Sequence, residues 1–316
     1  MVSNQDLEKL SPFELLAHQV VEGFITGLHK SPFHGFSVEF AEHRLYNTGE
    51  STRHIDWKLY GKTDKLFVKR YEEETNLRCY IVVDCSRSMQ FEQKLDFACK
   101  ATACLVHIIT QQRDAVGLTF FSDHIELQTE LKSTISHQKF LYQELENFAN
   151  GNAIGAGFAR PTTRGMQTVL TDKGRVNPAP TIPQILHDLA EQIHKRSLVI
   201  IFSDMFDDFS QTEALFGGLQ HLKFKQNDVI LFHTTAKNKE LDFDYPNRPH
   251  RFIDLETQSE LKINPNDVKE VYVQAIRQFQ KELKYRCQQY KIDYVNADVD
   301  EGYYPVLRAF LERRKK

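Results

Sequence analysis

Two short segments of the chain carry the acidic and hydroxyl side chains of a divalent-metal site. The first runs from Asp84 to Ser88 with the pattern D-x-S-x-S, and the second ends in Ser203-Asp204. Because alternate side chains of an extended segment point the same way, Asp84, Ser86 and Ser88 can converge on one point. Carboxylate and hydroxyl oxygens are the ligands that Mg²⁺ and Mn²⁺ prefer. The two segments therefore predict an all-oxygen metal site with one coordination position open to a carboxylate from another protein.

Each segment follows an unbroken apolar run, at residues 79–83 and 198–202. Runs of this kind are typical of strands that are buried on both faces of a parallel sheet. If the two strands are neighbours, Asp204 approaches the same point as Asp84. The alternative is that these residues only begin the next helix, with Ser88 as its N-cap.

The rest of the chain alternates buried strands with amphipathic helices. Further strands are predicted at residues 116–121, 229–232 and 292–295, and helices at 11–28, 95–109, 138–148, 182–193, 211–222, 268–290 and 304–311. This order predicts the α/β class, with a mostly parallel, doubly wound sheet and helices on both faces. Ligands of such sheets bind at the carboxyl ends of the strands, near the point where the strand order reverses.

The chain is expected to have two parts. Residues 1–75 form an N-terminal helix and an extended segment that packs on the main domain, and residues 76–316 form the α/β domain. A long loop is predicted at about residues 150–181, because glycine and proline are frequent there and no hydrophobic period survives.

The segment before the first acidic strand resembles a known family. Residues 46–57, YNTGESTRHIDW, fit the pattern Y-x-x-G-[DE]-x-x-R-x-I-D-W of the bacterial family called domain of unknown function 58, and residues 66–74 continue the resemblance. Asp84 to Ser88 and Asp204 resemble parts of the metal-ion-dependent adhesion site of von Willebrand factor type A domains. The resemblance implies a von Willebrand factor type A-like sheet with an N-terminal extension. It also implies association with a MoxR-type AAA+ ATPase and capture of a partner's acidic side chain through Mg²⁺ or Mn²⁺.

The adhesion-site pattern also implies a threonine or serine from a third loop. Thr162, Thr163, Thr168 and Thr181 compete for this role. Thr181 is favoured because it directly precedes the predicted helix at 182–193, whose start can aim it at the metal. The alternative is that Thr181 is an ordinary N-cap of that helix.

Composition narrows the class of partner. The net charge of −3 gives no overall attraction to nucleic acid or to an anionic membrane. No apolar run is long enough to span a membrane. The five cysteines include no C-x-x-C pair, which favours a reducing compartment and a cytoplasmic location.

The function expected from these residues is protein–protein interaction and not catalysis. A hydrolase using the same ion needs a positioned base or nucleophile and cations that receive phosphate oxygens, and only Arg87 is local. A metal-dependent hydrolase and a metal-free adaptor are the two alternatives.

Overall fold

The structure is a computed structural model that describes residues 11–25, 43–46, 57–69, 77–151, 181–206, 212–253 and 260–314. Its contacts divide the chain into one unit of Met1–Pro32 with Arg78–Lys316 and a second unit of Phe33–Leu77. The loop predicted at 150–181 lies almost wholly outside the described residues, and so do Thr162, Thr163, Thr168 and residues 47–56 of the family signature. The packing predicted for residues 1–75 stays a prediction.

The smaller unit contains an antiparallel strand pair and one short helix. Strand β1 (His43–Leu45) pairs with β2 (Phe67–Lys69), and helix α3 (Trp57–Thr63) lies between them in sequence. Trp57 contacts Tyr60 edge to face, with ring centroids 6.2 Å apart.

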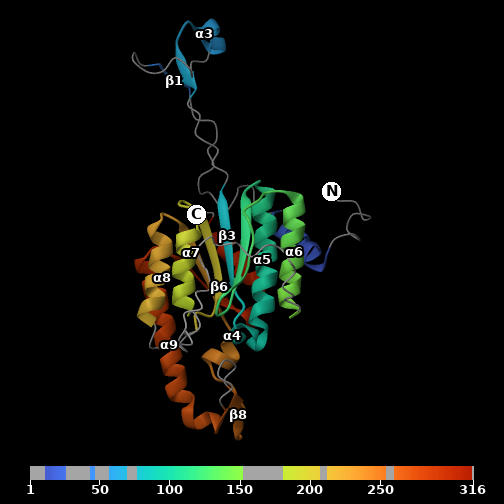
Figure 1. The fold of residues 1–316 in the computed structure, drawn as a ribbon, viewed down its shortest axis with the longest axis vertical. Coiled ribbons are helices and arrows are strands. Elements are labelled where there is room, and N and C mark those ends of the chain that lie inside the picture. Colours follow the sequence, from blue (N-terminus) through green and yellow to red (C-terminus); the bar gives the residue numbers. More distant parts are fainter. Residues whose placement is uncertain are drawn as a thin grey trace, which may run out of the picture. The chain divides into compact units, whose positions relative to one another are not determined.

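The larger unit is built on a six-stranded sheet with the order β10-β7-β6-β3-β4-β5 (Figure 1). The strands are β3 (Arg78–Asp84), β4 (Ala115–Phe121), β5 (Ile125–Gln128), β6 (Leu198–Ser203), β7 (Asp228–Thr235) and β10 (Asp293–Asp298). All neighbouring pairs are parallel except β4 and β5, which are antiparallel. The predicted mostly parallel sheet is therefore confirmed. The edge strand β5 was not predicted, because its exposed and half-buried residues lack an apolar run.

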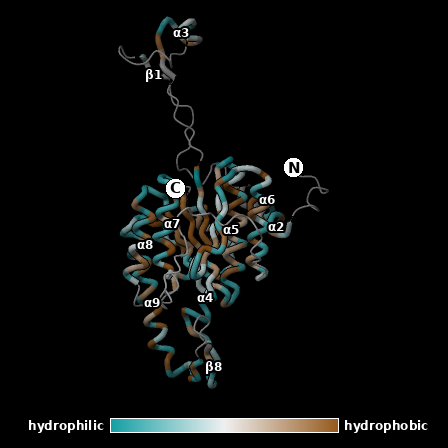
Figure 2. Tube along the Cα trace, in the orientation of Figure 1, coloured by the Kyte–Doolittle hydropathy of each residue, from teal (hydrophilic) through white to brown (hydrophobic). Residues whose placement is uncertain are grey.

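Helices cover both faces of this sheet, as the α/β pattern predicts. On one face α5 (Lys94–Gln111) packs against β3 and β4 and is surrounded by α2 (Pro12–Ile25), α6 (Ile135–Ala149) and α10 (Tyr303–Arg314). On the other face α7 (Ile182–Gln192) packs against α8 (Thr212–Phe224), and α9 (Pro265–Gln289) packs along β10. Figure 2 shows the hydrophobic central strands between these layers. Alternate residues of β3, β6 and β7, such as Val82, Ile201 and Leu231, form one core with α7 and α8.

The strand order places a topological switch point between β3 and β6. From β3 the chain passes through α5 to β4 on one side, and it later returns through α7 to β6 on the other side. In open α/β sheets, ligands bind at the carboxyl ends of the strands at such a point. Asp84 is the last residue of β3, and Ser203 is the last residue of β6. The short helix α4 (Arg87–Gln90), which follows β3, marks this edge in Figure 1.

A small appendage extends the larger unit beyond β7. It consists of the π-helix η4 (Lys237–Leu241), the antiparallel hairpin β8 (His250–Ile253) and β9 (Glu260–Ile263), and the first turns of α9. Stacked and edge-to-face aromatic rings hold it together, namely Phe243, Tyr245, Phe252 and Tyr272. In the described part of the chain, no helix is long and apolar enough to cross a membrane.

The contact between α7 and α8 depends on a glycine. A Cβ added at Gly218 would lie 2.9 Å from Leu186 Cβ and 3.2 Å from the Pro183 carbonyl oxygen. We therefore expect Gly218→Ala to lower the free energy of unfolding by about 1–3 kcal/mol, measured by urea denaturation, because the two helices must move apart. Gly217→Ala is the matched control, since its nearest neighbour is His187 Nε2 at 3.7 Å. An equal loss in both variants would contradict the steric explanation.

Candidate metal centre

Asp84 is completely buried at the switch point, and hydrogen bonds hold both of its carboxylate oxygens. Oδ1 accepts a bond of 2.9 Å from the Ser86 backbone N–H, and Oδ2 accepts a bond of 2.6 Å from Ser203 Oγ. Ser203 comes from the neighbouring strand and also accepts a bond of 2.9 Å from the Met205 N–H. The carboxylate of Asp84 is thus locked to both loops that follow the central strands.

Ser86 and Ser88 present their hydroxyls to each other. Their Oγ atoms are 3.0 Å apart. Ser86 occupies the N-cap position of α4, but its side chain makes no capping hydrogen bond. The two serine hydroxyls of the D-x-S-x-S segment therefore come together, as their alternation predicts, and the Ser86 hydroxyl is not used as a helix cap.

Asp204 lies beside Asp84 and is bound to a buried lysine that sequence analysis did not single out. Asp204 Oδ2 is 2.7 Å from Lys94 Nζ, and its Oδ1 accepts a bond of 3.0 Å from the Phe206 N–H. The same Nζ lies 2.5 Å from Glu240 Oε1. Lys94 is 1% exposed, and Asp204 is 5% exposed. The lysine therefore joins the loop after β6 to η4.

His233 at the end of β7 supports the backbone of this loop. Its Nε2 lies 2.9 Å from the Asp204 carbonyl oxygen, and its Nδ1 lies 2.8 Å from the Tyr294 hydroxyl. Because a carbonyl only accepts, Nε2 carries the proton and Nδ1 accepts from Tyr294. Burial lowers the pKa of His233 to about 4, so the ring is neutral at physiological pH.

The electrostatics of the site indicate an excess of negative charge. Burial, and next the neighbouring carboxylate of Asp204, raise the pKa of Asp84 from 3.8 to about 7, despite hydrogen bonds from Ser203 and Ser86 that favour ionisation. Burial acts to lower the pKa of Lys94, but Asp204 and Glu240 outweigh it and raise that pKa. Lys94 is therefore charged, and it balances only part of the charge of three clustered carboxyl groups.

The donor set fits a hard divalent cation. All the converging side chains of the two loops offer oxygen atoms, from the carboxyl groups of Asp84 and Asp204 and from the two serine hydroxyls. Adjacent ligands of an octahedral Mg²⁺ ion lie about 3 Å apart, which matches the spacing of the Ser86 and Ser88 hydroxyls. The Lys94 ammonium group disfavours a cation here, because it is positively charged and already forms an ion pair with Asp204.

Residues 42–282 match the family described as "Protein of unknown function DUF58". The match covers more than half of the chain. The chain belongs to this family. The resemblance of residues 46–57 to the family is thus confirmed, and the DUF58 match includes strands β3 to β7 of the sheet and both Asp84 and Asp204.

The curated relatives that match this DUF58 protein include mycobacterial proteins described as uncharacterized. Uncharacterized proteins of Mycobacterium bovis and Mycobacterium tuberculosis are 24% identical to it over 176 residues. The aligned part covers 52% of this chain and 56% of each relative, so the chain spans little more than half the length of these curated relatives.

Two solved structures are similar to parts of the DUF58 chain. They are the conserved hypothetical protein BatB of Bacteroides thetaiotaomicron and the pilus adhesin SpaC of Lactobacillus rhamnosus GG, each 13% identical. Each similarity covers 76% of this chain, with 98% of BatB and 29% of SpaC, and the TM-scores are 0.37 and 0.39. At this level of similarity no role is carried over from either protein.

Thr181, the fifth predicted ligand, begins helix α7 of the DUF58 protein as its N-cap residue. Its backbone N–H donates to Gln184 Oε1 at 3.2 Å, and its carbonyl accepts from the Ile185 N–H at 3.1 Å. These bonds stay within α7 and fit the capping alternative. Because α7 leads directly into β6, its first residue lies toward the carboxyl edge of the sheet, and a metal-binding role for Thr181 stays a prediction.

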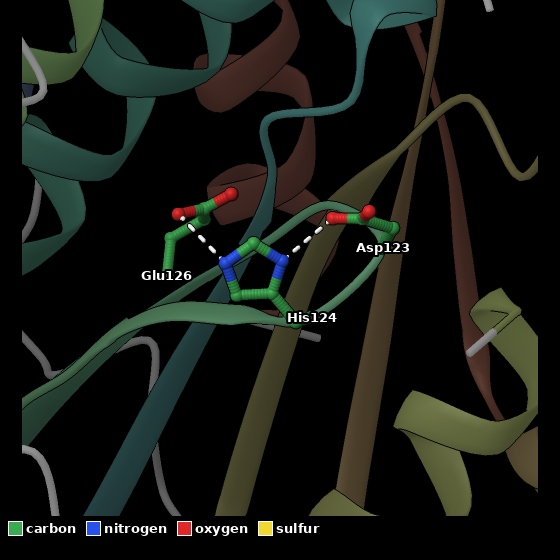
Figure 3. A group of neighbouring side chains, drawn as sticks. All are labelled: Asp123, His124 and Glu126. Atoms are coloured by element: carbon green, nitrogen blue, oxygen red, sulfur yellow. Dashed lines mark hydrogen bonds and ion pairs between the residues drawn. The ribbon is translucent and has the colours of Figure 1, made fainter. Parts of the chain in front are cut away.

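A second group of side chains that could hold a metal lies on the turn after β4 and at the start of β5. Asp123, His124 and Glu126 place one ligand atom each within 4.8 Å of one another, and all three are exposed. Figure 3 shows the His124 ring between the two carboxylates. Nδ1 lies 2.6 Å from Asp123 Oδ1, and Nε2 lies 3.2 Å from Glu126 Oε2. The two carboxylates therefore bind opposite nitrogens of one ring, as in an ordinary surface ion-pair group.

Lys94, His233 and Glu240 are the residues of this site that sequence reasoning missed. Lys94 stands at the start of an amphipathic helix, where a lysine normally lies in solvent. Glu240 falls in a polar stretch that follows a strand. Lys94 and Glu240 do not stand at a sequence distance from Asp84 or Asp204 that any known motif predicts. Only the tertiary structure therefore brings these two residues to the site.

Proposed function

We propose that this DUF58 protein is a non-enzymatic interaction module that captures an acidic side chain of a partner protein through a Mg²⁺ or Mn²⁺ ion. Asp84, Ser86, Ser88 and Asp204 would hold the ion, with Thr181 as a further ligand. The bound ion supplies a positive centre with an open position for a carboxylate. The residues of the chain hold and orient that ion.

One observation carries this proposal. The buried carboxyl groups of Asp84, at the end of β3, and Asp204, directly after the neighbouring β6, lie together at the switch point, and burial and Asp204 raise the pKa of Asp84 to about 7. Clustering like charges in a buried place is unfavourable unless a cation offsets it. A divalent ion at this place would restore the ionised form of Asp84.

The surroundings favour binding over catalysis. Burial raises the pKa of the Cys85 thiol, and its Sγ donates to the Phe121 carbonyl at 3.1 Å, so the thiol is protonated and engaged. His233 is buried and uses both ring nitrogens. Among the described residues, Cys85 and His233 beside Asp84 therefore offer neither a thiolate nucleophile nor a free histidine base of the kind that a hydrolase would use.

The partner class comes from the family resemblance. The resemblance implies a MoxR-type AAA+ ATPase, and a cytoplasmic location would give the module access to such an ATPase. We expect the purified ATPase to be retained on the immobilised DUF58 protein in Mg²⁺ and released by EDTA. Retention that survives EDTA in full would favour the metal-free adaptor instead.

Calorimetric titration with Mg²⁺ and Mn²⁺ tests the metal site itself. We expect saturable binding to the native protein and at least about a hundredfold weaker binding to Asp84→Ala, since a lost carboxylate ligand commonly costs several kcal/mol. His124→Ala is the control, and it should bind as the native protein does. Loss of binding in His124→Ala but not in Asp84→Ala would place the ion on the β4–β5 turn and contradict the proposal.

A further inference from the structure

Lys94 has an unusual position for a lysine. It is the first residue of α5, directly after Glu92 and Gln93, whose φ angles of 48° and 60° turn the chain sharply before the helix. The turn directs the Lys94 side chain inward, where it is 1% exposed. A cation at the N-terminus of a helix is opposed by the helix dipole, and its burial removes its hydration.

Two carboxylates from separate elements offset these costs. Asp204 Oδ2 lies 2.7 Å from Nζ, and Glu240 Oε1 lies 2.5 Å from it. The second oxygen of Glu240 accepts a bond of 2.8 Å from the Ala236 N–H, and Asp204 Oδ1 accepts from Phe206. Every carboxylate oxygen of this ion group is therefore engaged, and Nζ occupies the oxygen of Asp204 that the loop backbone leaves open.

From this geometry we infer that Lys94 is a tethered cation that competes with a divalent ion for Asp204. This inference rests on the proposed metal site and adds its regulation. When the divalent ion binds Asp204, the ammonium group of Lys94 keeps only Glu240 as its partner. Lys94 therefore pairs with two carboxylates without the ion and with one carboxylate when the ion is bound. Without the ion, Lys94 neutralises part of the charge at the switch point and lets the site fold.

The exchange links the site to the appendage. Glu240 lies on η4 within the appendage, and the neighbouring Lys239 joins η4 to the residues that follow it, through its Nζ bond of 2.6 Å to the Asp244 carbonyl and its position over the Tyr245 ring. The ion pair between Glu240 and Lys94 therefore depends on the position of η4 and of the rest of the appendage. A partner that moves η4 would change the affinity of the site for its ion.

Replacement of Lys94 tests the competition. Lys94→Met keeps the length of the side chain and removes its charge, and we expect it to bind Mg²⁺ and Mn²⁺ at least about tenfold more tightly than the native protein in calorimetry. Lys94→Arg keeps the charge and should not tighten binding. The Mg²⁺-dependent rise in Tm should likewise be larger for Lys94→Met than for the native protein.

A double variant controls for misfolding of Lys94→Met and for the change in net charge that this substitution causes. Lys94→Met leaves Glu240 and Asp204 without their cation, whereas Lys94→Met with Glu240→Gln removes one charge of each sign and keeps the net charge of the site. This double variant should also bind the ion at least about tenfold more tightly than the native protein.

The outcomes separate the two proposals. Tighter binding in both variants supports the tethered cation, including the case in which the native protein binds too weakly to measure. Equal or weaker binding in a folded double variant, with saturable binding in the native protein, overturns the role of Lys94 and leaves the metal site intact. No binding by any of the folded proteins overturns the metal site and the competition together.

Discussion

Asp84→Asn is expected to make the metal-free protein more stable at about pH 8, raising its free energy of unfolding by on the order of 2 kcal/mol. The reason is that Asp84 is buried beside Asp204, which raises its pKa from 3.8 to about 7. The full shift corresponds to about 4 kcal/mol at about 1.4 kcal/mol per unit, and we expect part of it to be lost because asparagine cannot copy every hydrogen bond of the carboxylate.

The sign of the pH dependence follows from the direction of the shift. A raised pKa means that the folded chain holds the Asp84 proton more tightly than the unfolded chain does, between the values of 3.8 and about 7. The contribution of Asp84 to stability is therefore most favourable below that window and is lost as the pH rises through it. The advantage of Asp84→Asn over the native protein at about pH 8 should shrink as the pH falls through this window. At about pH 4 it should become a deficit of on the order of 2 kcal/mol, because the lost hydrogen bonds of the carboxyl group are then no longer offset.

Urea denaturation in EDTA over this pH range measures the effect. Asp123→Asn is the control, because hydrogen bonds from His124 and Ser122 lower the pKa of that exposed carboxyl and should give a small effect of the opposite sign. With saturating Mg²⁺ the native protein should gain stability and Asp84→Asn should not. A variant that is less stable than the native protein at every pH would show that Asp84 is ionised and well compensated without metal.

Phe232→Ala is expected to lower the free energy of unfolding by about 3–5 kcal/mol. Phe232 is completely buried in the centre of β7. Its ring stacks on Phe202 with centroids 4.6 Å apart and meets Phe310 of α10 edge to face at 5.1 Å. Truncation would leave a cavity between the sheet and α10, next to His233, which supports the backbone of the Asp204 loop.

Chemical denaturation of the folded variant measures this loss, and Phe224→Ala is its control. Phe224 is 84% exposed at the end of α8, so its removal should change stability by less than about 0.5 kcal/mol. A loss below about 1 kcal/mol for Phe232→Ala would mean that α10 does not close this face of the sheet in solution.

The sequence by itself determines the layers of the larger unit. Unbroken apolar runs such as residues 79–83 and 198–202 are typical of strands that are buried on both faces of a parallel sheet. The amphipathic helices between these strands cover the two faces of that sheet. The same reasoning failed for β5, β8 and β9, because short, half-exposed strands have no apolar signal and pair only where a neighbour is already in place.

The sequence also determines that the Ser86 and Ser88 hydroxyls come together next to Asp84, because their alternation is a local property of the chain. The strand order was needed to bring Asp204 beside Asp84, since pairing of β3 with β6 is a contact between distant segments. Lys94 and Glu240 were decided by tertiary structure alone. Their ion pair depends on the sharp turn before α5 and on the position of η4. Its strength comes from burial, which results from the packing of the whole unit and cannot be read from a local sequence pattern.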